Sequence, residues 1–162
     1  MISTDSSNVV LTVLLALSPI LAGCAEERKF DREPTYPVIG KFLVDGKPVG
    51  EHSLGGQPLR GVVRAISVDV QKFDGKKATA AQSWTEPDGS FALSTYIKGD
   101  GVLAGTYKIT FETGMQNLIT GGIGGDVLKG KYKDPDTSEY TVTVTGDETE
   151  PIDLETIDLS TP

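Results

Sequence analysis

Several short segments of the chain alternate apolar and polar residues, which is the pattern of strands that bury one face. Tyr107, Ile109 and Phe111 alternate with polar neighbours, and residues 140–145 alternate in the same way. We expect strands at seven segments in all, namely residues 38–44, 66–71, 78–85, 91–94, 106–112, 140–145 and 152–159. In the last segment the apolar positions change parity, which predicts a β-bulge near Thr156.

Turn signals lie between these segments. Asp-Gly pairs occur at residues 45–46, 74–75, 88–89 and 100–101, and this dipeptide favours the positive φ angles of tight hairpin turns. Residues 115–133 show no clean period and are expected to form a long connection. Nineteen glycines and threonine-rich strands agree with many turns and little helix, so the sequence predicts an all-β domain, most simply a β-sandwich.

The N-terminal region has a different character. Residues 9–22 are apolar except for Thr12, Ser18 and Pro19, which is too short for a membrane span of ~20 residues but fits the apolar region of a signal peptide. Residues 1–8 contain no Lys or Arg, so only the terminal amine supplies the usual positive charge. Cys24 follows the apolar run and is the single cysteine of the chain, so it has no internal disulfide partner.

The segment Leu21-Ala22-Gly23-Cys24 resembles the lipobox of bacterial lipoproteins. The resemblance implies that the Cys24 sulfur receives a diacylglycerol, that the leader is cut before it, and that the new amino group takes a further acyl chain such as palmitate. Residues 1–23 are then a lipoprotein signal peptide, 24–36 an acylated cysteine with a polar tether, and 37–162 the domain.

Cys24 could also follow a secretory signal that is cleaved near a cysteine by coincidence, or it could be buried in a core. The charges at residues 26–29 argue against burial. Ala25 stands where an aspartate would indicate retention at an inner membrane, so we expect an extracytoplasmic protein at an outer membrane or cell surface.

The charge balance limits the partners. Residues 24–162 hold fifteen Lys and Arg against twenty-two acids, a net charge of −7. Nucleic acids and anionic lipid headgroups would be repelled, so we expect no nucleic-acid partner.

The order of the short turn and strand motifs resembles that of small bacterial lipoproteins with a carboxypeptidase regulatory-like, or transthyretin-like, domain. The motifs are Pro37-Val38-Ile39-Gly40-Lys41, Asp45-Gly46-Lys47-Pro48-Val49, Asp88-Gly89-Ser90-Phe91, Leu93-Ser94-Thr95-Tyr96, Gly105-Thr106-Tyr107 and Lys131-Tyr132 through Asp134-Pro135 and Thr137-Ser138. The resemblance covers most of residues 37–159 and implies a seven-stranded Greek-key sandwich without catalytic residues of its own. Extra residues at 50–61 depart from the family pattern.

Three segments carry residue types that could support chemistry. Residues 125–132 nearly match a phosphate-binding loop, but Tyr132 replaces the Ser or Thr that must reach magnesium, which favours a plain glycine loop. Asp134, Asp136 and Glu139 offer oxygen ligands for weak calcium binding, although a solvated turn accounts for them as well. His52 is the sole histidine, so the sequence offers no multi-histidine metal site, and a Ser-His-Asp triad would need this residue. We expect no metal site, cofactor or enzymatic activity.

Aromatic side chains give the remaining candidate site. Trp84, with Tyr96 and Tyr132, could contact a glycan by stacking on sugar rings, whereas a tryptophan near a strand end is commonly packing. The sequence therefore favours a non-catalytic binding or structural module of the cell envelope, held to a membrane by Cys24. The alternative is an accessory protein that binds carbohydrate or peptide for an envelope complex.

Overall fold

The computed structural model describes residues 32–71, 77–116 and 123–162, and Glu33–Pro162 form one compact unit. This unit is built of strands, and among the described residues its one helical element is the 3-10 turn η1 (Val49–Glu51). The strands are β1 (Val38–Val44), β2 (Lys47–Pro48), β3 (Ser53–Leu54), β4 (Gln57–Pro58), β5 (Arg60–Gln71), β6 (Lys77–Trp84), β7 (Ser90–Ala92), β8 (Gly105–Gln116), β9 (Ile123–Gly124), β10 (Thr141–Val144) and β11 (Ile152–Leu159). The all-β prediction is confirmed, and each of the seven expected segments overlaps one of these strands.

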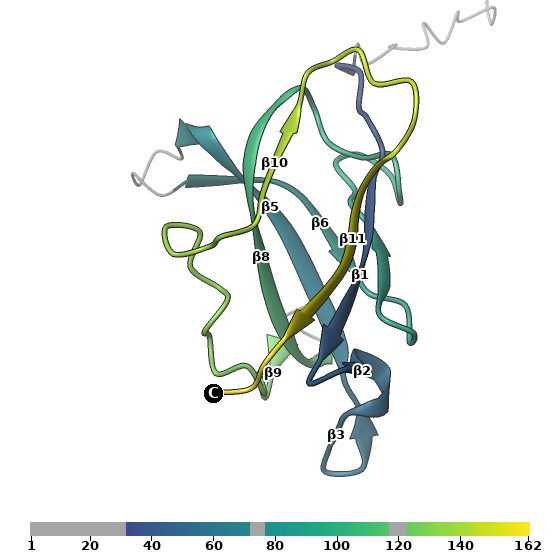
Figure 1. Cartoon of the computed structure of the whole chain (residues 1–162), viewed down its shortest axis with the longest axis vertical. Helices are drawn as coiled ribbons and strands as arrows, with labels where there is room; N and C mark the ends of the chain where they lie inside the picture. Colours follow the sequence, from purple (N-terminus) through teal and green to yellow (C-terminus); the bar gives the residue numbers. More distant parts are fainter. Residues whose placement is uncertain (1–31, 72–76, 117–122) are drawn as a thin grey trace, which may run out of the picture. The chain divides into compact units, whose positions relative to one another are not determined.

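The strands form two main sheets (Figure 1). The larger has the order β10-β8-β5-β6 with antiparallel pairing, and β9 adds to the end of β8. In the smaller sheet β1 pairs with β11 on one edge and with β7 and β2 on the other. The pairing of β1 with β11 is parallel, so the first and last long strands of the fold run side by side in the same direction.

The core lies between the two sheets. The rings of Phe42 from β1 and Phe111 from β8 pack with centroids 5.1 Å apart, which fixes the contact between the layers. Gly61 makes room for this contact, because a Cβ at that position would lie 2.6 Å from the Phe42 ring. The largest side chains that are fully buried are Phe42, Leu59, Leu93, Ile109, Phe111, Leu128 and Leu159.

The change of parity in β11 is a β-bulge, as the sequence predicts. Ile39 pairs with Asp153 and Lys41 pairs with Thr156, so a step of two residues along β1 corresponds to a step of three along β11. Glu155, inside the bulge, has a φ of +58°. The bulge lets Ile157 and Leu159 face the core beyond it.

The predicted turn at Asp45-Gly46 is confirmed. Both residues have positive φ, +49° and +75°, and they join β1 directly to β2 because Val44 pairs with Lys47. Of the other predicted Asp-Gly turns, the glycines at 89 and 101 also have positive φ, whereas residues 74–75 lie outside the described residues.

One prediction of burial is wrong. Alternation in residues 66–71 predicts that Val68 and Val70 face the core, but they are 38% and 58% exposed. The pairing of β5 with β8 ends at Ser67, so the strand continues past the layer that would cover these side chains. The core instead uses Val63 and Ala65, earlier in the same strand.

The expected connection at residues 115–133 is also shorter than predicted. Strand β8 continues to Gln116, and Met115 pairs with Gly124 of β9. Residues 117–122 lie outside the described residues. Residues 50–61 include part of η1, the small β3-β4 hairpin and the start of β5.

Candidate functional site

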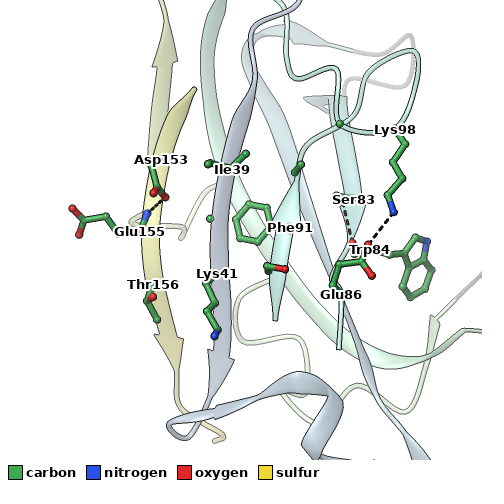
Figure 2. A pocket seen from close by; sticks show the side chains of 14 residues that line it. Ile39, Lys41, Ser83, Trp84, Glu86, Phe91, Lys98, Asp153, Glu155 and Thr156 are labelled. Carbon is green, nitrogen blue, oxygen red and sulfur yellow. Dashed lines mark hydrogen bonds and ion pairs between the residues drawn. The ribbon is translucent and has the colours of Figure 1, made fainter. Parts of the chain in front are cut away.

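A groove of about 640 Å³, open to solvent, lies over the smaller sheet. Its floor is formed by β1 and β7, and it extends from the bulge of β11 to the end of β6 (Figure 2). Cross-strand pairing places Lys41 beside both Thr156 and Ser90, so these three side chains share one face of the sheet. The lining residues are Ile39, Gly40, Lys41, Ser83, Trp84, Glu86, Ser90, Phe91, Ala92, Lys98, Gly99, Asp153, Glu155 and Thr156.

Charged side chains lie on both sides of this groove. Lys98 Nζ is 2.9 Å from Glu86 Oε1, and the hydrogen bond it donates lowers the pKa of Glu86. On the other side, Asp153 Oδ1 accepts a 2.8 Å hydrogen bond from the backbone N–H of Glu155. Figure 2 marks no hydrogen bond or ion pair for the Lys41 ammonium among the residues drawn. Outside the residues drawn, the hydrogen bonds from Ser90 and the positive charge of Lys41 lower the pKa of the Asp88 carboxyl, so Lys41 lies near an acid at this end of β1.

Trp84 lies at the rim of the groove, as the last residue of β6. It is half-buried and pairs with Val62 of β5. The guanidinium carbon of Arg60 lies 5.5 Å from the centroid of the indole ring, a distance typical of a cation-π contact. One face of the ring is thus used within the protein.

The other two aromatic candidates lie elsewhere. Tyr96 is 41% exposed in the loop between β7 and β8, and it does not line the groove. Tyr132 packs against the core, and its hydroxyl oxygen lies 3.3 Å from the hydroxyl of Ser160. Of the three side chains proposed for glycan contact, the groove therefore uses Trp84 alone.

A second polar cluster lies on the larger sheet, around Glu112. This carboxylate is on β8 with 8% of its side chain exposed, and it forms ion pairs with Arg64 of β5 and with Lys133, whose Nζ is 2.7 Å from Glu112 Oε1. A cavity of about 680 Å³ adjoins the cluster. Lys77 also faces this cavity and pairs with Asp136 at 2.5 Å.

The ionisation of Glu112 follows from these contacts. Burial opposes the charged form, but hydrogen bonds from Lys133 and Arg64 favour it more strongly, so the pKa of Glu112 lies below its ordinary value. The carboxylate is therefore a charged, fully partnered group that ties the loop at Lys133 to the sheet.

The segment that resembles a phosphate-binding loop is organised around Asp126. Its carboxylate accepts hydrogen bonds from the backbone N–H groups of Leu128 and Gly130, at 3.1 and 2.8 Å, and from the amide and hydroxyl of Thr113. A phosphate would need such amides, and here the protein's own carboxylate occupies them. Residues 127–133 form turns rather than a helix.

The calcium candidates are not grouped as ligands. Asp134 Oδ1 accepts a hydrogen bond from the Asp136 backbone N–H at 2.9 Å, which is the geometry of a turn, and Asp136 is paired with Lys77. In the part of the chain that the structure describes, no three His, Cys, Asp or Glu side chains gather in a way that could hold a metal ion.

His52 has a structural contact. Its Nε2 donates a 2.9 Å hydrogen bond to the carbonyl of Val44, and the residue is half-buried. Cys24 lies outside the described residues.

The groove residues other than Trp84 do not stand out in the sequence. Lys41, Glu86, Lys98 and Asp153 come from four separate segments, two of them strands that pair with β1 or belong to it and two of them loops. The available signal was the parity of β1, which places Lys41 on the face opposite Phe42.

Comparisons with known proteins place the chain in no family. No family model matches the sequence, and no curated protein matches it. Among solved structures the chain is similar to the crystal structure of a 9R-lipoxygenase from Cyanothece PCC8801, with 10% identity and a TM-score of 0.35. The match covers 78% of this chain and 16% of the lipoxygenase chain, and a likeness this low carries no argument about function.

Proposed function

We propose that the protein is a lipid-anchored, extracytoplasmic module that binds or scaffolds in the cell envelope without catalysis. The observation that carries the proposal is Leu21-Ala22-Gly23-Cys24, which follows the apolar residues 9–22. Two or three acyl chains on Cys24 give stable anchoring, because each buried methylene contributes ~0.8 kcal/mol. We assign the protein to an outer membrane or cell surface on the basis of Ala25.

The way the chain enters the fold supports a tethered module. The first backbone pairing in the described residues joins Tyr36 to Val102, so eleven residues separate Cys24 from the sandwich. A chain of this length reaches at most about 40 Å when fully extended. Among the residues described, no helix has the length and apolar content to cross a bilayer.

The side chains that a catalytic role would need have structural partners. His52 is hydrogen-bonded to the backbone of Val44, and Asp126 caps its own loop. Glu112, the most buried of the charged groups described, is held by two cations. These contacts favour a non-catalytic role.

Replacing Cys24 tests the proposal. A Cys24→Ala variant, compared with wild type by membrane fractionation, should move from the membrane to the soluble fraction because the thioether has no other site on the chain. A Ser18→Ala variant, which changes the apolar run but not the lipidation site, should remain in the membrane. An unchanged distribution of the Cys24 variant would refute the lipid anchor.

A second candidate function, binding of carbohydrate or peptide for an envelope complex, is favoured by Trp84 at the rim of the groove. An aromatic ring beside charged and hydroxyl side chains suits a sugar face and its hydroxyls. Trp84→Ala should then abolish binding on an array of envelope glycans. Tyr96→Ala, which changes an aromatic residue outside the groove, should leave binding intact. No glycan signal with the wild-type protein would favour the scaffolding role.

A further inference from the structure

The loop between β7 and β8 presents two adjacent apolar side chains to solvent. Tyr96 is 41% exposed, and Ile97, at 61%, is the most exposed large apolar side chain in the described residues. Residues 93–102 contain one lysine and one aspartate, so this loop is neutral on a protein whose residues 24–162 carry a net charge of −7.

The loop is held in one conformation by its own hydrogen bonds. The Asp100 carboxylate accepts the backbone N–H groups of Thr95, Tyr96 and Ile97 at 2.8, 3.0 and 3.0 Å. Thr95 Oγ1 also donates to the Gly101 carbonyl at 2.7 Å. The backbone under the two exposed side chains is therefore preorganised, which reduces the entropy that binding would cost.

The stem of this loop is the place where the tether joins the fold. The backbone N–H of Tyr36 donates to the Val102 carbonyl at 2.8 Å, and the N–H of Val102 donates back at 2.9 Å. The backbones of Tyr36 and Gly101 lie so close together that a Cβ on Gly101 would be 1.9 Å from the Tyr36 carbonyl oxygen. The chain that leads to Cys24 thus leaves the sandwich beside Val102, five positions along the chain from Ile97.

We propose that Tyr96 and Ile97 insert into the interfacial layer of the bilayer that holds Cys24, giving the domain a second, noncovalent membrane contact. This inference rests on the proposed lipid anchor. Tyrosine suits the interface because its ring is apolar and its hydroxyl remains in the headgroups, while Ile97 enters the acyl boundary. Because the loop is neutral, it can approach a surface that repels the acidic remainder of the protein. Tethering makes the insertion intramolecular, so a contact too weak to hold a free domain is sufficient.

The test places one dye at the tip of the loop and one at a matched control site. Ile97→Cys and Leu54→Cys are made separately in the full chain, labelled with a maleimide dye that is sensitive to polarity, and added to preformed phosphatidylcholine vesicles. Leu54 is a suitable control because it is also an exposed apolar residue, 41% exposed, and β3 lies at the end of the sandwich away from the start of β1 (Figure 1).

We expect aqueous iodide to quench the dye at position 97 at least about threefold less than the dye at position 54. Lipids with a nitroxide on the headgroup should quench only the dye at position 97. Equal iodide quenching at the two sites would overturn the inference. It would also be overturned if the dye at position 97 were shielded in native envelopes but not in vesicles, because the tip would then contact a protein.

Wild-type protein in the same labelling reaction separates this inference from the anchor on which it rests. An acylated Cys24 has no free thiol, so wild type should take up no dye. Uptake of dye by wild type would refute the lipid anchor itself. Absence of uptake together with equal quenching at both sites would leave the anchor intact and refute only the insertion of the loop.

Discussion

The two sheets use their charged residues differently. On the larger sheet, Glu112 is buried and is paired with Arg64 and Lys133. On the smaller sheet, Lys41, Asp153 and Glu155 line a groove that is open to solvent. A buried charge must be paired because desolvation is costly, whereas a solvated charge can exchange its water for a ligand. The comparison indicates that the Glu112 cluster stabilises the fold, whereas the charges that line the groove are open to solvent.

Removal of the Glu112 charge should have the largest effect. Glu112→Gln leaves Arg64 and Lys133 without a carboxylate, and we expect a loss of about 2 kcal/mol in the free energy of unfolding. Glu155→Gln, the matched change in the groove, should alter it by less than about 0.5 kcal/mol. Urea denaturation measures both. Equal losses for the two variants would show that the faces do not differ.

The same carboxylate should make stability depend on pH. The pKa of Glu112 is lowered in the folded protein, with burial opposed by the stronger hydrogen bonds from Lys133 and Arg64. The contribution of Glu112 to the free energy of unfolding is therefore fully present above its unfolded pKa of about 4.5. It is lost as the pH falls through the pKa of Glu112 in the folded protein. We expect wild type and Glu112→Gln to differ most near neutral pH and to converge below about pH 4.5.

The difference in unfolding free energy between wild type and Glu112→Gln separates the titration of Glu112 from that of other acids. Glu148 also titrates at low pH, because backbone hydrogen bonds led by that from Thr145 lower its pKa to about 2, but it does so in both proteins. A difference in unfolding free energy that stays constant across the acid range would contradict the role assigned to Glu112.

Substitution of two lysines, one from each sheet region, should have the smallest effects on the free energy of unfolding. Lys133→Met removes a cation from a buried carboxylate and should cost about 1 kcal/mol of unfolding free energy. Lys98→Met removes the cation that pairs with Glu86. The side chains of Lys98 and Glu86 are 88% and 51% exposed, so this substitution should change stability little. Thermal unfolding of the pair checks this order. A greater loss at Lys98 would mean that the ion pair in the groove is structural.

The sequence correctly predicts the strands that bury one face and expose the other to solvent. The bounds of β1 and β11 match the expected residues, and the bulge follows from the change of parity around Thr156. The prediction is wrong along β5, where Val62 and Val63 are both buried, so residues 60–65 give no alternation, while Val68 and Val70 alternate beyond the covering layer. Periodicity reports a strand but not where its partner layer ends.

The candidate sites depend on strand register, which the sequence does not contain. Glu112 meets Arg64 because Val62 pairs with Glu112 and Arg64 pairs with Thr110, an alignment that joins residues 48 positions apart. The groove likewise needs the parallel pairing of β1 with β11. Trp84 is the exception, because a lone tryptophan at a strand end is conspicuous by composition alone.

The most direct test of the account is the intact mass of the mature protein purified from membranes. We expect a chain that begins at Cys24 and carries a diacylglycerol on its sulfur, with a further acyl group on its amine. Detection of Cys24 with a free thiol, or of a chain that still retains residues 1–23, would contradict the proposal that this β-sandwich is displayed on a lipid.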